Sequence, residues 1–332
     1  MKIYIDWLQC FCRGQISVPP AYSLCSTGIR SRTFAVIEEI KLFDKSIGFL
    51  CSKPQSSILP PDSYMLKFSN EILYSPTFSK TYDLFINRSG ITMHNISRID
   101  ICTDFNHFDF FRDPENLIKD FFCEKIIYSR HSIFKIIGDT NHGLTRDYLR
   151  FGSNLSTLSV YLYRKSLEMK QKVFKSYIAD LWKKNGLNLN LPIWRLEFSL
   201  KGGAHNIVDN STGEIIPLNT HIFFNQSRLH DFFISLVSKY FKFVYANNSI
   251  PIKKLKQLKL FNTDFCPYEH FYLTKSQDLT RGDRIFIKRL ENLNHEIRES
   301  NPELADHVVE LSDFFSSIKG LSEYRRFVSS VV

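Results

Sequence analysis

The sequence is poor in the features that mark several classes of protein. Glycine and proline account for only 13 and 12 of its 332 residues, which excludes a fibrous repeat and argues against a disordered chain. No run approaches the roughly 20 apolar residues that a membrane-spanning helix needs, so we expect no membrane partner. The opening segment Met-Lys-Ile-Tyr-Ile-Asp has a charge inside any apolar core, which argues against a signal peptide.

Cysteine spacing excludes two further classes. The seven cysteines are scattered and form no Cys-x-x-Cys pair, so neither a zinc site nor a disulfide framework is expected. A reduced, cytoplasmic compartment fits this usage better. What the chain has in quantity is aromatic residues, 30 Phe and 15 Tyr, together with a net charge of +9. This charge favours a polyanionic partner, nucleic acid before membrane.

Part of that charge is concentrated in one segment. Between residues 228 and 263, Asp231 is the single acid against seven basic residues. Two interpretations remain equally open, a solvated lysine face on an amphipathic helix and a surface that contacts phosphates. The basic residues of this segment are Arg228, Lys239, Lys242, Lys253, Lys254, Lys256 and Lys259.

Hydrophobic periodicity predicts an α+β fold with a central, largely antiparallel sheet and flanking helices. Strands are expected at 2–9, in a hairpin over 33–51, at 64–74 and 97–105, in a meander over 132–138, 146–151 and 157–165, and at 191–201, with a hairpin at 211–213. Helices are expected at 77–88, 113–123, 166–185, 227–245, 280–298, 302–318 and 321–331, and a loop at 13–32. We predict a β-rich region 1–225 and a helical, basic region 226–332.

The strand predicted at 157–165 has two chemically different faces. Leu158, Val160 and Leu162 would turn one way, and Tyr161, Tyr163 and Lys165 the other. Tyrosine on a strand usually serves packing, because its ring suits a pleated surface. This pattern therefore predicts a hairpin strand with an aromatic outer face.

Two other strands carry acids. Arg98, Asp100 and Asp104 share one face of 97–105, and Arg195 and Glu197 share one face of 191–201. Buried charges need a partner, and one interpretation is structural ion pairs, Arg98 with one of the acids and Arg195 with Glu197. The other is a Mg²⁺ or Mn²⁺ site, which needs carboxylate oxygens from different strands. Beside a tyrosine strand, such a site would suit a phosphodiester transesterase.

Several short motifs occur together along the chain. They lie at 70–75, 97–105, 149–153, 161–168 and 194–199, with a weaker echo at 5–8. In this order and spacing the sequence resembles the replication initiation factor family of rolling-circle plasmids and of mobilisable or phage-like elements in Bacteroidetes-type bacteria. The resemblance implies a degenerate rolling-circle nuclease fold and a metal-dependent enzyme that nicks and closes DNA through a 5′-phosphotyrosine. It also implies a replication origin with a single-stranded or cruciform nick site and a host helicase as partners, and leaves a homodimer open.

The resemblance also assigns roles to residues. It implies Tyr163 as the nucleophile, with Tyr161 second, and Lys165 as a phosphate contact or an aid to Tyr163. Many members have an acidic or amide residue after the tyrosine, where this chain has Arg164, which we assign to DNA contact. The implied metal ligands are Asp100 and Glu197, followed by Asp104 and Asp6.

Two competing functions are weighed against this one. A non-catalytic origin-binding or regulatory protein would use the strand acids as structural pairs. A tyrosine recombinase is disfavoured, because the middle of the chain reads as β-rich. The His-hydrophobe-His metal motif of relaxases is absent, and we interpret His221 as an ordinary buried or edge histidine. The decisive check is whether Asp100, Glu197 and Tyr163 converge on one face of one sheet.

Overall fold

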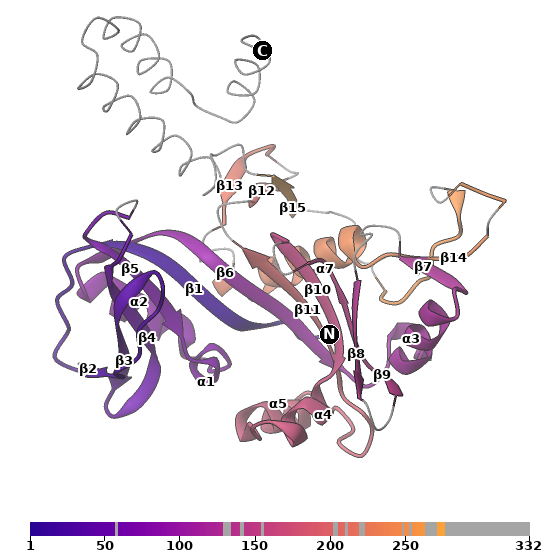
Figure 1. The fold of residues 1–332 in the computed structure, drawn as a ribbon, viewed down its shortest axis with the longest axis horizontal. Coiled ribbons are helices and arrows are strands. Elements are labelled where there is room, and N and C mark those ends of the chain that lie inside the picture. The colour runs from indigo at the N-terminus through magenta and orange to yellow at the C-terminus, as the bar shows by residue number, and fades with distance from the viewer. Residues whose placement is uncertain are drawn as a thin grey trace, which may run out of the picture.

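A large antiparallel sheet organises the chain (Figure 1). The computed structural model describes residues 1–56, 59–128, 134–139, 143–153, 156–201, 205–209, 212–218, 223–247, 249–251, 254–262 and 271–275. Ten strands lie in the order β2-β3-β4-β5-β1-β6-β11-β10-β9-β8, and every neighbouring pair is antiparallel. The α+β prediction with a central antiparallel sheet is therefore confirmed. The helices predicted after residue 280, together with His221 and Lys253, lie outside the described residues.

The strands follow the predicted alternation closely. Two segments differ from the prediction. β2 lies in the segment predicted as a loop and begins two residues after Pro20. The strand predicted over 64–74 ends at Phe68, and residues 70–73 form a helix instead. The first five strands are β1 (Tyr4–Gly14), β2 (Tyr22–Ser26), β3 (Phe34–Leu42), β4 (Lys45–Pro54) and β5 (Ser63–Phe68). The other five are β6 (Ile91–Phe105), β8 (Phe134–Asp139), β9 (Gly143–Phe151), β10 (Leu158–Arg164) and β11 (Trp194–Lys201).

Helices fill the connections between strands. They are α1 (Asn70–Leu73), α2 (Phe78–Arg88), α3 (Pro114–Phe122), α4 (Lys165–Gln171), α5 (Ser176–Lys184) and α7 (Gln226–Tyr240), with a 3₁₀ turn at Asp109–Phe111. Asp113 caps α3, because its side chain accepts a hydrogen bond from the backbone N–H of Glu115 at 2.9 Å. The single helix predicted at 166–185 is wrong, since α4 and α5 are separated at Lys172. Val173 is 70 % exposed there and not part of an apolar stripe.

Two small sheets accompany the large one. β7 (Ile126–Tyr128) pairs with β14 (Phe243–Tyr245), so the helix predicted to reach residue 245 ends at Tyr240. β12 (His205–Asp209) pairs with β13 (Ile215–Pro217) and with β15 (Phe271–Lys275). The β12–β13 pair confirms the hairpin predicted around residues 211–213.

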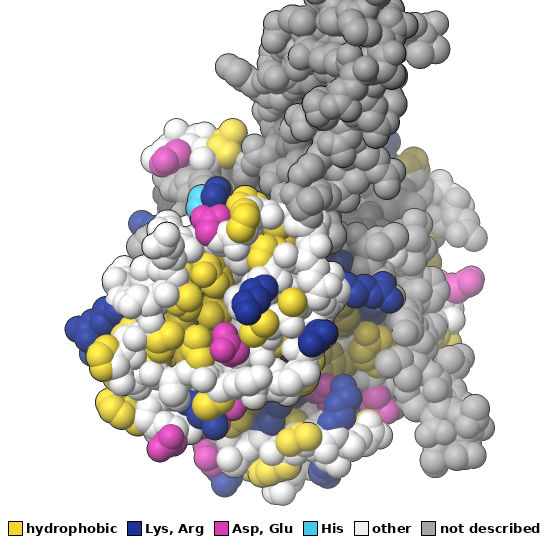
Figure 2. Space-filling view, turned by 60° about the vertical axis from the view of Figure 1, so that its left-hand side comes forward, with side chains coloured by type: hydrophobic (Ala, Val, Ile, Leu, Met, Phe, Trp, Pro, Cys, Tyr) yellow, Lys and Arg dark blue, Asp and Glu magenta, His cyan; other side chains and the backbone are white. Residues whose placement is uncertain are grey.

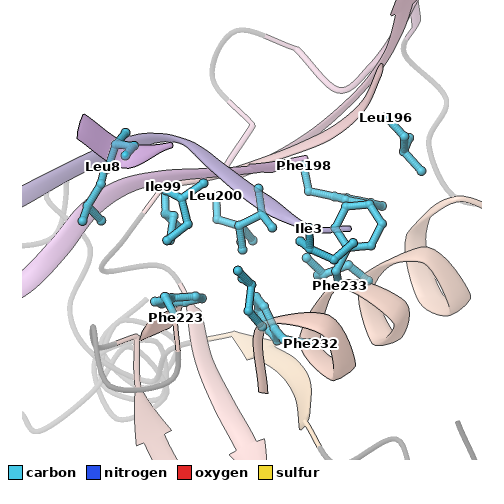
Figure 3. Packing of buried hydrophobic residues seen from close by; sticks show 14 of the residues in the cluster. Ile3, Leu8, Ile99, Leu196, Phe198, Leu200, Phe223, Phe232 and Phe233 are labelled. Carbon is cyan, nitrogen blue, oxygen red and sulfur yellow. The ribbon is translucent and has the colours of Figure 1, made fainter. Parts of the chain in front are cut away.

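The core lies on one face of the large sheet. In Figure 3, Phe198 and Ile99 point from the sheet toward Phe232 and Phe233 of α7. The rings of Phe198 and Phe233 pack edge to face with their centres 5.3 Å apart. Burying each such side chain contributes about 2–3 kcal/mol to the folding free energy. Helix α7 begins where the second region was predicted to start and nevertheless packs on the sheet. The division at residue 225 stays a prediction.

Helices α2 and α3 pack into the same apolar layer. The ring centres of Phe78 of α2 and Phe224 are 5.3 Å apart, and those of Phe121 of α3 and Phe151 of β9 are 5.7 Å apart. Helices α1, α4 and α5 instead contact the opposite face, which carries the polar residues of the strands. Over the described ranges, no helix is long and apolar enough to cross a membrane.

Candidate active site

The predicted site residues share one face of the sheet. In the β10–β11 pair, Tyr161 lies opposite Glu197, and in the β11–β6 pair, Asp100 lies opposite Ser199. Because side chains alternate along a strand, the odd-numbered residues of β10 and β11 and the even-numbered residues of β6 face away from α7. The structure thus brings Asp100, Glu197 and Tyr163 together. We call the set Asp6, Asp100, Asp104, Tyr161, Tyr163, Arg195 and Glu197 the polar cluster.

A β-bulge brings Asp6 into the cluster. The β1–β6 register shifts between Ile5 and Trp7, which lets Asp6 and Trp7 escape strict alternation. Asp6 accepts hydrogen bonds from Tyr74 at 2.6 Å and from Asn70 at 3.1 Å, both contributed by the α1 segment. Sequence alternation alone does not place Asp6 here, because a bulge is a tertiary feature.

Arg195 is the buried cation of the cluster. It is fully buried and pairs with Asp6 at 2.6 Å and with Asp104 at 2.6 Å, which corrects the ion pair predicted between Arg195 and Glu197. Asp104 also accepts a hydrogen bond from the Trp182 indole at 2.8 Å. Burial opposes ionisation of Asp6, but Arg195 and then Lys165 hold its pKa below the ordinary range. Asp6, Asp104 and Arg195 therefore form a closed ionic unit.

Glu197 has a different environment. Its carboxylate accepts a hydrogen bond from the Tyr163 hydroxyl at 2.9 Å and forms no ion pair within the described residues. Burial, followed by the charges of Asp100 and Asp6, raises the pKa of Glu197 to about 8. Asp100 pairs with Arg98 at 2.5 Å, as one of the predicted ion pairs requires, and burial still raises its pKa. Glu197 is thus a buried carboxyl poised near neutrality.

The two tyrosines of β10 differ in their surroundings. Burial of the Tyr163 hydroxyl and the charge of Glu197 raise its pKa well above the usual value. The Tyr161 ring is half-buried, lies 6.4 Å from the Tyr148 ring and has the Arg150 guanidinium 5.1 Å from its centre. Its hydroxyl has no hydrogen bond to a described residue. Tyr161 is thus the less constrained phenol.

Lys165 lies beside Tyr163, and its predicted roles, a phosphate contact or an aid to Tyr163, stay predictions. Its ammonium lies 2.6 Å from Glu168, its ion-pair partner, and donates a hydrogen bond to the Tyr163 hydroxyl at 3.5 Å. Lys165 begins α4 and joins that helix to the end of β10.

The donor set suits a divalent cation in part. Among the described residues, no three or more His, Cys, Asp or Glu side chains are grouped to hold a metal. Asp100 and Glu197 are hard oxygen donors on adjacent strands, and burial, followed by repulsion from Asp100, raises the pKa of Glu197. Mg²⁺ is often held by only one or two carboxylates, with water and a substrate phosphate completing its shell. Glu197 fits that arrangement, since its carboxylate accepts only from Tyr163 among the described residues. Asp100 would have to exchange Arg98, which donates to both of its oxygens, for the ion. The oxygens of Asp104 are taken by Arg195 and Trp182.

The residues predicted to contact DNA lie in two places. Arg164 ends β10, where its guanidinium approaches Asp147 at 3.5 Å. Lys239 lies in α7, and Lys242 follows it directly. The described lysines after β14, Lys254, Lys256 and Lys259, are exposed. These lysines lie on and after α7, whereas the polar cluster is built on β1, β6, β10 and β11.

Sequence reasoning missed several residues that shape the site. Tyr74 and Trp182 hold the acids in place, and Tyr148 and Arg150 of β9 flank Tyr161. Alternation in β9 was the available signal, because Tyr148 pairs with Tyr163 and Arg150 with Tyr161 in the β9–β10 register. No sequence signal points to Trp182, whose partner Asp104 is 78 residues away.

Comparison with known proteins gives similarities to solved structures alone. No family model matches the sequence. A search of curated proteins also finds no match. Among solved structures, the chain is similar to the rolling circle replication initiator protein from Geobacillus stearothermophilus, with 14% identity and a TM-score of 0.47 over 81% of this chain and 96% of that one. At this level the similarity assigns no activity, and the proposals below rest on the residues of this chain.

Proposed function

We propose that this chain is a DNA nicking and closing enzyme that initiates rolling-circle replication. The supporting observation is that two tyrosines and two buried carboxyls from three adjacent strands share one face, with the Tyr163 hydroxyl 2.9 Å from Glu197 and Tyr161 opposite Glu197. Phenols next to carboxylates that suit Mg²⁺ are the groups that phosphodiester transesterification requires. The motif resemblance supplies the biological role.

Within this proposal, Tyr161 is the nucleophile and Tyr163 a positioning residue. The Tyr163 hydroxyl is buried and donates to Glu197, and its raised pKa opposes formation of a phenolate. Both tyrosines are half-buried, but the Tyr161 hydroxyl has no hydrogen bond to a described residue, and Arg150 provides positive charge near its ring. This order reverses the sequence-based ranking, because the resemblance alone does not show which phenol can reach a phosphate.

The reaction exchanges one phosphodiester bond for another. The Tyr161 phenol gives its proton to solvent, and its oxygen attacks the phosphorus of the scissile bond. The bond from phosphorus to the 3′ oxygen breaks, and that oxygen takes a proton from water to become the 3′ hydroxyl primer. A 5′-phosphotyrosine remains, and attack by a 3′ hydroxyl on it closes the strand.

Mg²⁺ or Mn²⁺ would be held by Glu197 and Asp100. When bound, such an ion neutralises charge on the scissile phosphate. The chain's own residues do the rest. Tyr163 fixes the Glu197 carboxylate, and the ionic unit of Arg195, Asp6 and Asp104 holds the strands in register.

Other parts of the proposal concern partners. Arg164 and the basic residues at 239–259 would contact the origin DNA. A host helicase and a second copy of this chain remain proposed partners, and the cytoplasm the proposed compartment. Salt should weaken DNA binding steeply if these lysines contact phosphates.

Nicking of supercoiled DNA tests the proposal. The substrate is a plasmid that carries the region around this chain's own gene, incubated with Mg²⁺ or Mn²⁺. We expect nicked circles and a covalent adduct, and we expect Tyr161→Phe to lower both by at least about 1,000-fold. Tyr148→Phe is the matched control. It removes a hydroxyl from the ring that lies beside Tyr161 and Tyr163, and this variant should keep most of the activity.

The outcomes separate the alternatives. If Tyr163→Phe abolishes the adduct and Tyr161→Phe does not, the nucleophile is Tyr163. If no divalent metal supports nicking while origin DNA is still bound, the chain is a non-catalytic origin-binding protein. That second function is favoured by the closed pairing of Asp104 and Arg195, which needs no ligand.

A further inference from the structure

A strip of aromatic and basic side chains crosses the N-terminal half of the sheet. The Trp7 ring has the Lys67 ammonium 3.7 Å from its centre and the Arg98 guanidinium carbon 4.5 Å from it. Lys67 also lies 6.0 Å from the centre of the Phe49 ring. All four side chains are half-buried. We call Phe49, Lys67, Trp7 and Arg98 the Trp7 strip.

The strip is continuous with the polar cluster. Across β4, β5, β1 and β6, Phe49 pairs with Lys67, Lys67 with Gln9, and Gln9 with Arg98. One step along β1 and β6, Trp7 pairs with Asp100. Cross-strand partners lie on the same face of a sheet, so the strip leads directly to the carboxyls of the candidate active site.

The charges of the strip are not balanced. Arg98 is paired with Asp100, but Lys67 forms no ion pair with any residue that the structure describes. Burial and the neighbouring charge of Arg98 lower the pKa of Lys67. Lys67 and Arg98 come from the two strands that flank β1 and both lie close to the Trp7 ring, so an anion bound beside Lys67 would offset its unpaired charge. A nucleic-acid phosphate provides such an anion.

The rings favour single strands over duplex. Bases of single-stranded nucleic acid stack on aromatic side chains of an open sheet, whereas a duplex hides the faces of its bases. Figure 2 shows the side of the N-terminal half, where hydrophobic side chains reach the surface between scattered Lys and Arg side chains. We propose that the Trp7 strip binds single-stranded DNA and guides it to the polar cluster. This inference rests on the proposed function, which makes a DNA strand the substrate.

Tryptophan fluorescence provides a direct test. The chain has three Trp residues, and Trp182 and Trp194 are only 5 % and 2 % exposed. A single-stranded oligonucleotide of about 10 nucleotides, added in EDTA so that no nicking occurs, should therefore quench mainly Trp7. We expect Trp7→Phe to remove the quenching and Lys67→Gln to weaken binding about ten-fold, as anisotropy of a labelled oligonucleotide would show. Lys80→Gln, a charge loss at an exposed position of α2, should change affinity less than about two-fold.

The results distinguish this inference from the proposed function. If nicking fails in every metal while quenching and the Lys67→Gln effect persist, the enzyme proposal is wrong and the strip still binds DNA. If nicking succeeds but single strands neither quench Trp7 nor depend on Lys67, the inference is overturned. Equal binding and quenching by the matched duplex would also overturn it, because the strip would then not select single strands.

Discussion

The two halves of the large sheet share a strand order and differ in their chemistry. In the first half the chain leaves the central strand β1 for the edge strand β2 and returns through β3 and β4 to β5, beside β1. In the second half it leaves β6 for β8 and returns through β9 and β10 to β11, beside β6. The halves meet at the β1–β6 pair. A repeated topology thus surrounds a single site.

The polar faces of the two halves are different. The second half places its acids and tyrosines beneath α4 and α5, where Arg195 and Trp182 close the site. The first half leaves Lys67 and Trp7 only half-buried. Asp6 crosses the boundary, since it comes from β1 and pairs with Arg195 of β11. The comparison predicts that ionic changes will be costly in the second half and mild in the first.

Arg195→Met should cause the largest loss in the free energy of unfolding. This change leaves Asp6 and Asp104 buried without their cation, and removing one partner of a buried ion pair typically costs about 3–5 kcal/mol. Urea denaturation should show it as a lower midpoint. Arg13→Met is the control, because the side chains of Arg13 and its partner Asp62 are 40 % and 39 % exposed, and losing this pair should lower the midpoint far less. Equal losses would contradict the distinction between a closed and an open face.

That ionic unit also marks the limit of sequence reasoning. Period-two alternation predicted β6, β10 and β11. It left open whether Asp100, Glu197 and Tyr163 share a face, because alternation does not say which strands pair. Alternation did not predict that Arg195 pairs with Asp6 instead of Glu197. That pair depends on a bulge in β1 and joins residues that are 189 positions apart in the sequence. The repeated strand order was also invisible, since it is a pattern of topology without a repeated sequence.

Gly48→Ala should disturb the first half by packing and not by charge. A Cβ at position 48 would lie 2.3 Å from the backbone oxygen of Lys67 on the paired strand β5. Such overlap with backbone must be relieved by moving a strand, which we expect to cost about 2–3 kcal/mol. Ser52→Ala on the same strand is the control and should cost less than about 0.5 kcal/mol. Thermal melting of both variants checks this, and a neutral Gly48→Ala would show that β4 and β5 are not so close.

Glu197→Gln should stabilise the second half at alkaline pH. The pKa of Glu197 is about 8 in the folded chain, against an ordinary value of 4.5. Between those values the folded state binds a proton that the unfolded state has released, so stability falls as pH rises through this window. Glutamine stays neutral, and the variant should gain about 1–2 kcal/mol over the native chain at pH 9.

The measurement is a pH series of urea midpoints in EDTA. Glu168→Gln is the control of opposite sign, because burial is outweighed there by Lys165 and Lys172, which lower the pKa of Glu168. Its stabilising contribution is present above the ordinary pKa and is lost as pH falls through the lowered value, so Glu168→Gln should destabilise at neutral pH. A Glu197→Gln profile parallel to that of the native chain would contradict the raised pKa.

Lys172→Ala should cause the smallest loss in the free energy of unfolding. Lys172 and Lys165 bind the same carboxylate of Glu168, at 2.9 Å and 2.6 Å, but their side chains are 72 % and 4 % exposed. Solvent screens the outer pair, so its loss should cost less than about 0.5 kcal/mol and vanish in high salt. Lys165→Met removes the buried partner and should cost about 2 kcal/mol at any ionic strength. If both variants lost the same free energy of unfolding, burial would not explain why ion pairs in the second half of the sheet stabilise more than pairs at its surface.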